Sequence, residues 1–162
     1  MERKYELVKN DTIVIGFINL YRIKALRDFG DVKKGDIGGY IETEENLSHK
    51  GLCWVSDNAR AHGNSWIAGN AQVSGSAWIY GNSWIYGNAL VCGNSWISGD
   101  TFVYGNAQIS GDARVVDNTK IFGNANVSGN ARVSGYANIS KDANIWKPSD
   151  YVTKGPIGIR ED

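Results

Sequence analysis

Hydrophobic and polar positions recur with a period of six residues between Leu52 and Lys147. This stretch consists of sixteen consecutive hexads of the type Asn-Ala-x-Val-x-Gly, as in NAQVSG at residues 70–75. The fourth position is Val or Ile in fifteen hexads, and the second is always Ala, Ser, Thr or Cys. Because side chains alternate along a strand, these uniform positions are predicted to face a core and positions three and five to face outward. A repeat this short predicts a solenoid, whose units bury their apolar side only by stacking.

The ends of each hexad predict a corner between short strands. Position six is Gly in twelve hexads and position one is Asn or Asp in thirteen, and these residues tolerate the left-handed backbone of a tight bend. Three strands and three corners make a coil of 18 residues, and stacking at about 4.8 Å per coil gives roughly five coils. The predicted fold is therefore all-β, a triangular parallel β-helix.

Residues 1–51 do not follow the repeat. KYELV, TIVIGF and INLYRIKAL are rich in β-branched and aromatic residues and are separated at Asn10-Asp11 and Gly16, which predicts a small β-meander. A helix within residues 20–29, through Leu20, Ile23 and Leu26, is the competing prediction. Residues 28–51 are expected to form an irregular connection that covers the open end of the solenoid, whose strand edges would otherwise pair with other chains.

Three segments follow from this pattern. Residues 1–51 form the N-terminal cap and connection, residues 52–147 the hexapeptide-repeat β-helix, and residues 148–162 a short C-terminal cap or tail. The last segment leaves the register and contains both prolines of the chain. Since proline cannot donate to a strand ladder, this segment is expected to stop the addition of coils.

The outward positions fall into three columns, one for each face of the prism. One face is mostly small and polar and is predicted to be a solvated wall, although Trp54 begins its column. A second face carries Arg60, Trp78, Tyr80, Trp96 and Arg114. The third is predicted to form one contiguous aromatic surface made of Trp66, Trp84, Tyr86, Phe102, Tyr104 and Phe122.

Three interpretations of these aromatic residues stay open. They could stabilise the stack through contacts between neighbouring strands, as cross-strand pairs do. They could form a self-association surface, because apolar patches larger than a few hundred Å² are rarely left uncovered. They could instead bind a different partner, such as a protein or a sugar that stacks on tryptophan, with Arg60 and Arg114 providing orientation at the rim.

Charge and cysteine usage narrow the classes of function. The chain has 17 basic and 17 acidic residues and no basic stripe, so nucleic-acid binding is not expected. The N-terminus has no apolar signal core and no segment is long enough to span a membrane, so a soluble cytoplasmic protein is expected. Cys53 is predicted to point inward and Cys92 outward, so the two cysteines should not form a disulfide.

The hexad pattern resembles the hexapeptide-repeat proteins, a family whose fold is the left-handed parallel β-helix. The resemblance implies the left-handed sense, which spacing alone does not give, and its best-known members are trimeric acyltransferases. A more specific resemblance covers nearly the whole chain. LYRIKALRDFGDVKKGDIGGYIETEENLS, the NAxVxG run and KGPIG are similar to phage- and prophage-encoded YdcK-like proteins, which implies an architecture and a phage context and no particular reaction.

Candidate chemistry is sparse. The acyltransferases that the repeat resembles use a histidine as general base beside a loop protruding from the coils, and here only His49 and His62 exist and no hexad carries an insertion. His62 is expected on the surface next to Arg60. Ser65, Ser83 and Ser95 are expected to fill inward positions and not to act as nucleophiles. No metal-ligand spacing is present, so neither a metal nor a cofactor is expected.

The leading hypothesis is thus a non-catalytic scaffold, in the form of a homotrimer or alternatively a dimer, that presents a rigid surface to a host or virion protein. The alternative is a trimeric acyltransferase that binds acetyl-CoA between subunits.

Overall fold

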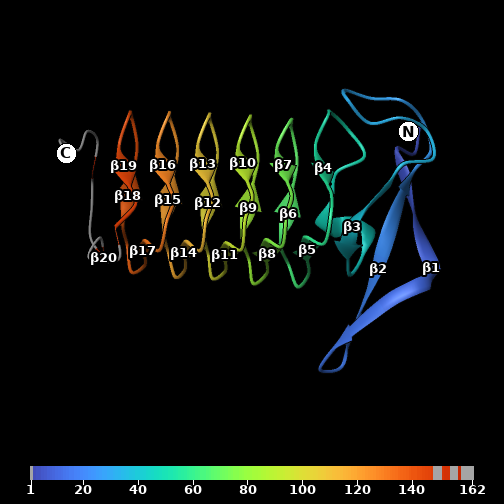
Figure 1. Cartoon of the computed structure of the whole chain (residues 1–162), viewed down its shortest axis with the longest axis horizontal. Coiled ribbons are helices and arrows are strands. Elements are labelled where there is room, and N and C mark those ends of the chain that lie inside the picture. The colour runs from blue at the N-terminus through green and yellow to red at the C-terminus, as the bar shows by residue number, and fades with distance from the viewer. Residues whose placement is uncertain (1, 148–150, 154–156, 158–162) are drawn as a thin grey trace.

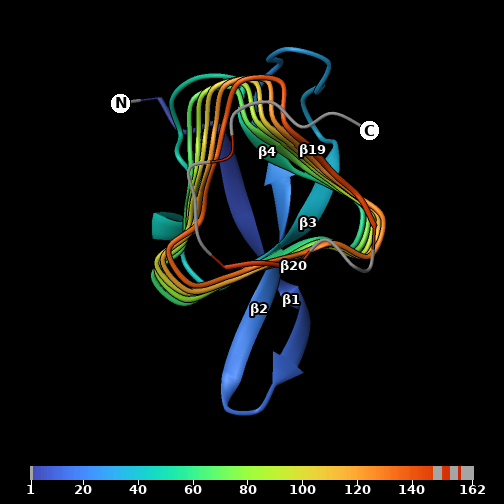
Figure 2. The same cartoon turned by 90° about the vertical axis from the view of Figure 1, so that its left-hand side faces the viewer.

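The computed structural model describes residues 2–147, 151–153 and 157 of the chain. These residues form an all-β solenoid of about six turns, which is a long prism in Figure 1 and a triangle when viewed along its axis in Figure 2. An antiparallel cap stands at the N-terminal end of the prism. The sense of the helical winding stays a prediction from the family resemblance.

Each hexad contributes one short strand, as predicted, and this strand covers only the third and fourth positions. Because a turn takes 18 residues, every third strand joins the same sheet: Leu90 pairs in parallel with Gln72 on one side and Gln108 on the other. One side of the prism, here the polar face, consists of β4 (Trp54–Val55), β7 (Gln72–Val73), β10 (Leu90–Val91), β13 (Gln108–Ile109), β16 (Asn126–Val127) and β19 (Asn144–Ile145).

The other two sides are built in the same way. The aromatic-ladder face consists of β6 (Trp66–Ile67), β9 (Trp84–Ile85), β12 (Phe102–Val103), β15 (Lys120–Ile121) and β18 (Asn138–Ile139). The arginine–tryptophan face contains β5 (Arg60–Ala61), β8 (Trp78–Ile79), β11 (Trp96–Ile97), β14 (Arg114–Val115), β17 (Arg132–Val133) and β20 (Tyr151–Val152), and it continues into the cap.

The core of the prism is made by the inward positions. Every second- and fourth-position residue between Cys53 and Ile145 is buried, which confirms the predicted sidedness of the strands. Cys53 lies in this core, Cys92 is partly exposed, and both thiols are free. The hydroxyls at inward positions bond to their own corners: Ser83 Oγ donates to the carbonyl of Tyr80 at 2.8 Å and Ser95 Oγ to that of Cys92 at 2.9 Å. These two hydroxyls therefore stabilise the corners that precede their strands.

The corners repeat as closely as the strands. Gly105 has a φ of +65°, and the equivalent corner residues Asp117 and Lys141 adopt the same left-handed conformation. Position-one amides stack in ladders along the prism, for example where Asn88 Nδ2 donates to Asn106 Oδ1 at 3.3 Å. Such in-register amides add side-chain hydrogen bonds to the stacking of the turns.

The cap is an antiparallel β-meander of β1 (Tyr5–Ile15), β2 (Ile18–Ala25) and β3 (Ile37–Ile41), followed by the 3₁₀ turn η1 (Glu44–Asn46). Residues 18–25 are therefore a strand, and the competing helix is wrong. The expected break at Asn10-Asp11 is instead a bulge, since β1 continues past a register shift between Val8 and Thr12. The two-residue turn at Gly16-Phe17 matches the Gly16 break.

Strand β3 corrects the prediction that residues 28–51 are irregular. It pairs with β2 on one side and in parallel with β5 on the other, with Tyr40 opposite Arg60. The strand can approach the first coil this closely because of its glycines: a Cβ on Gly38 would lie 2.5 Å from the carbonyl oxygen of Val55. Gly38 and Gly39 thus allow the backbone of β3 to contact the first coil.

Two additional partial turns explain why the solenoid has about six turns, one more than expected. At the N-terminal end, β3 stacks on β5 and Leu47 forms a bridge with Ile67. At the other end, β20 pairs with β17 and Ile157 bridges to Ile139. Stacking therefore continues beyond Lys147, and the expectation that coil addition stops there is wrong. Both prolines, Pro148 and Pro156, lie outside the described residues.

The cap closes the open end of the core with side chains. Tyr5 and Phe29 pack edge-on against the Trp54 ring, with ring centroids 6.3 and 5.2 Å away. Trp54 is consequently 4% exposed, and its assignment to the solvated wall is wrong, because the column analysis did not include a covering element. Among the described residues, no helix has the length and apolar character that a membrane crossing would need.

Candidate binding surfaces

The aromatic-ladder face carries six of the predicted interface residues on adjacent turns. Trp66 and Trp84 contact edge-on at a centroid distance of 5.2 Å, and Trp84 contacts Phe102 at 5.7 Å. In the next column, Tyr86 stacks on Tyr104 and Tyr104 on Phe122, both at 5.0 Å and 4°. The ring contacts thus run along each column, so the predicted contiguous surface consists of two parallel ladders.

The ladders are unevenly accessible. Trp66 and Trp84 are 37% and 44% exposed, whereas Phe102, Tyr86, Tyr104 and Phe122 are half-buried. Burial raises the pKa of the Tyr86 phenol, as expected for a hydroxyl group that loses water in the stack. Farther along the face, the outward positions become polar at Lys120 and Asn138. The aromatic residues of the strand column are therefore confined to the first three turns, whereas the neighbouring ladder reaches Phe122 on the fourth turn.

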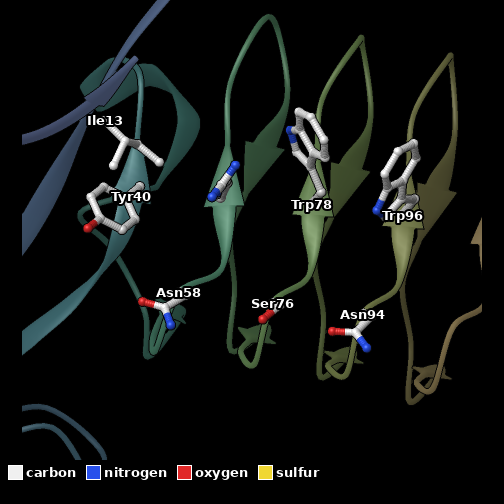
Figure 3. Close-up of a pocket in the computed structure, with 8 residues that line it drawn as sticks. Ile13, Tyr40, Asn58, Ser76, Trp78, Asn94 and Trp96 are labelled. Carbon is white, nitrogen blue, oxygen red and sulfur yellow. The ribbon is translucent and has the colours of Figure 1, made fainter. Parts of the chain in front are cut away.

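The arginine–tryptophan face contains a groove of about 450 Å³. Figure 3 shows Tyr40, Trp78 and Trp96 in one row along the face, in which β5 separates Tyr40 from Trp78, with Asn58, Ser76 and Asn94 in a second row along the neighbouring corner. The β1–β2 hairpin closes one end of the groove with Ile13. Trp78 and Trp96 meet edge-on at a centroid distance of 5.1 Å.

Arginine side chains flank the two tryptophans of this groove. The Arg60 guanidinium lies 5.8 Å from the Trp78 ring centre, and the Arg114 guanidinium lies 4.7 Å from that of Trp96. Arg132 follows Arg114 on the next turn, directly opposite it in register. Within the described part of the chain, none of these three arginines forms an ion pair with a carboxylate.

His62 is not the surface histidine that the sequence suggested. It is 8% exposed, its Nε2 accepts a hydrogen bond of 2.7 Å from the Trp78 indole, and its ring stacks on Tyr80 at 5.3 Å. Burial lowers the pKa of His62; the Glu42 carboxylate opposes this shift and Arg60 adds to it. Because Nε2 accepts the hydrogen bond from the Trp78 indole and the ring is buried, this geometry supports a structural role for His62.

His49 is also built into the fold. Its Nδ1 accepts a hydrogen bond of 3.1 Å from the backbone N–H of Lys4, and its ring stacks on Tyr5 at 4.2 Å. Burial is the main cause that lowers its pKa, against the nearby Glu44 carboxylate. In the described residues, no group of three or more His, Cys, Asp or Glu side chains is arranged to hold a metal ion.

Sequence reasoning placed the aromatic and arginine columns correctly but missed the groove. The columns follow from the 18-residue period, and the observed strand pairing confirms them, with Trp78 opposite Arg60 and Trp96. The groove also needs Ile13 and Tyr40 of the cap, which no repeat register relates to the coils. The only available signal was the segment IGGYI, in which Tyr40 and Ile41 are strand-forming residues that follow two glycines.

The fold and its two outward surfaces define a triangular β-solenoid repeat protein with non-uniform faces. A family model described as the YdcK β-solenoid repeat matches residues 85–99 and 107–119. The central coils of the chain thus carry repeats of the YdcK type, in agreement with the resemblance seen in the sequence. The match concerns the repeat: it leaves out the cap and includes only Asn94 and Trp96 of the residues that line the groove. No curated protein matches the chain.

Proposed function

We propose that this protein is a non-catalytic β-solenoid scaffold, which forms a homo-oligomer through the aromatic-ladder face and presents a rigid surface to a protein partner. A trimer is the expected oligomer, as in the hexapeptide-repeat proteins that the chain resembles. The YdcK-type resemblance extends the proposal to its setting: a phage-encoded protein acting in the bacterial cytoplasm on a host or virion protein.

The observation that carries the proposal is the exposure of Trp66 and Trp84 on the first two turns of a straight, regular face. A stable interface needs roughly 800 Å² on each partner. Six aromatic side chains, at about 150–250 Å² each when fully buried, can supply an area of that order even though contacts within the ladders cover part of every ring.

Self-association fits this face better than an unrelated partner does. Its outward residues follow one repeat, so copies can meet in register, and a closed symmetric interface uses the same patch on every copy. The only charged residue in the Trp66 column among the described turns is Lys120, which lies 6.0 Å from the Phe102 ring. Like-charge repulsion across the apolar centre of the interface would therefore be absent.

The test is the oligomeric state in solution. Size-exclusion chromatography with light scattering should give a trimer for the wild type. The Trp84→Ala/Phe102→Ala variant should shift towards monomer, because it removes two rings in contact at the centre of the face.

A matched control is Leu90→Ala/Gln108→Ala, which changes two outward residues that are paired in the same way on the polar face and should leave the oligomer intact. A wild type that is already monomeric, or a control that dissociates equally, would refute the assignment of this face. Circular dichroism of all variants separates loss of assembly from loss of folding.

A further inference from the structure

The groove on the arginine–tryptophan face is not explained by the self-association proposal. It lies on a different side of the prism from the aromatic ladders, and its walls come from both the coils and the cap. We propose that this groove is a binding site for a short carboxylated oligosaccharide. The inference does not depend on the oligomeric state, because it rests on the side chains of one chain.

The first argument is the pairing of aromatic rings with small polar groups. Pyranose rings pack their C–H faces on aromatic side chains and need donors and acceptors for the hydroxyl groups at their edge. Trp78 and Trp96 are both partly exposed in the groove, and the row of Asn58, Ser76 and Asn94 runs beside them (Figure 3). An amide can donate and accept at once, which suits a sugar hydroxyl.

The second argument is charge. The three arginines of this face have no carboxylate partner in the described residues, and a guanidinium binds a carboxylate through two parallel hydrogen bonds. Arg60 and Arg114 hold their guanidinium groups close to the outer sides of the two tryptophans, so a ligand on the rings would have a cation near each end. An anionic ligand is therefore favoured over a neutral one.

The third argument is size and spacing. The groove volume of about 450 Å³ is within the range of small-molecule sites, roughly 300–1,000 Å³. A second hollow of about 200 Å³, lined by Arg114, Val116, Arg132, Val133 and Ser134, follows on the same face. Successive turns are spaced at about 4.8 Å, which is comparable to the length of one pyranose residue, so consecutive sugars could meet consecutive turns.

The same features are less suited to other anionic polymers. Single-stranded nucleic acid binds on aromatic residues within a groove that is positively charged along its length, whereas here the two tryptophans have an arginine only on either side, Arg60 and Arg114. An acidic peptide would gain from apolar pockets for alternate side chains, whereas the row beside the tryptophans is made of small polar residues. Both ligands are nevertheless included in the test.

The experiment is a titration of the full chain, by calorimetry and tryptophan fluorescence, with trimers of galacturonic, mannuronic and glucuronic acid. At least one should bind, and neutral maltotriose should bind at least tenfold more weakly. The variants Trp78→Ala and Arg114→Gln should each weaken binding at least tenfold. Arg60→Gln should weaken it as well, and serves in place of Trp78→Ala if loss of the Trp78–His62 contact impairs folding.

Trp84→Ala/Phe102→Ala is the matched control, because it removes aromatic residues from the neighbouring face and should leave saccharide affinity unchanged. This variant also separates the two proposals, since it tests assembly and binding independently. Binding to none of the three acidic trimers would overturn the inference. So would equal affinity for maltotriose, or stronger binding of a glutamate decapeptide or a ten-nucleotide oligothymidylate than of any saccharide.

Discussion

The N-terminal cap and the repeating coils share one continuous sheet on the arginine–tryptophan face, but different contacts hold them together. In the coils, each strand bonds to the equivalent strand one turn later, and the same inward Ala, Val and Ile recur. The cap is instead joined to the first coil by individual buried polar side chains, none of which belongs to a repeat. Lys4 Nζ donates to the carbonyl of Cys53 at 2.7 Å, and Tyr5 Oη to that of Leu47 at 2.6 Å.

The difference shows how a solenoid is ended. A coil in the middle has a neighbour on both sides, whereas the first coil has carbonyl groups and a Trp54 ring with no coil beyond them. Asn46 resolves part of this problem, because its Nδ2 donates to the carbonyls of Gly63 and Ser65 at 3.0 and 2.9 Å. Polar side chains thus replace the missing coil, since a buried carbonyl without a partner is costly.

The largest expected effect concerns the close approach of cap and coil. Gly38→Ala should lower the free energy of unfolding by about 3 kcal/mol, because the new Cβ would lie 2.5 Å from the Val55 carbonyl oxygen and 2.7 Å from the Trp54 ring. Gly105→Asn at a corner should cost less, about 1 kcal/mol, because its new Cβ would meet only the Gly123 backbone nitrogen closely, at 2.9 Å, and Asp117 and Lys141 already occupy equivalent corners. Urea unfolding of the two variants measures both changes. Equal losses in the free energy of unfolding would contradict the claim that the contact between cap and coil tolerates a side chain less well than a corner does.

A smaller effect is expected at the buried ammonium group. Lys4→Met should cost about 2 kcal/mol, the scale of one hydrogen bond to a charged group, because it leaves the Cys53 carbonyl without its Nζ donor. Burial lowers the pKa of Lys4, so part of the lost stabilisation is offset by relief of desolvation. The exposed Lys24→Met is the control. Hydrogen exchange should rise in residues 5–25 and stay unchanged in the central coils; uniform acceleration would show that Lys4 supports more than the cap.

The smallest expected effect is that of acid. Burial lowers the folded-state pKa of His49 in the cap and of His62 in the first coil. Just below pH 6.5, the ordinary pKa of histidine, the unfolded chain therefore binds more protons than the folded chain. The stability that the two neutral histidines contribute to the folded state is complete above that pH. It is lost as the pH falls towards the folded-state pKa, by less than about 1.4 kcal/mol per pH unit for each histidine. Urea midpoints between pH 8 and 5 measure this loss.

The variants His49→Gln and His62→Gln assign the acid effect to the cap and to the coil. Each should flatten the decline below pH 6.5, and glutamine at position 62 can still accept the hydrogen bond from Trp78. An unchanged pH profile in both variants would mean that other groups control acid stability.

How much could be predicted from the sequence differs between the same two regions. The sixteen hexads predicted the short strands, the inward core and the three outward columns, because each residue's environment repeats every 18 positions. The cap was predicted only as a meander. The bulge between Val8 and Thr12, the pairing of β3 with β5 and the burial of Trp54 depend on contacts between segments that no period relates.

The features of the candidate surfaces can likewise be separated into those that the repeat predicted and those that depend on other contacts. The sequence alone determined which aromatic and arginine residues share a face, since strand alternation and turn length place them there. Only the tertiary structure decided that the rings form two separate ladders, that His62 bonds to Trp78, and that the hairpin closes a groove beside Trp78 and Trp96. Periodicity specifies the direction in which a side chain points, whereas rotamers and the packing of non-repeating segments determine what it meets.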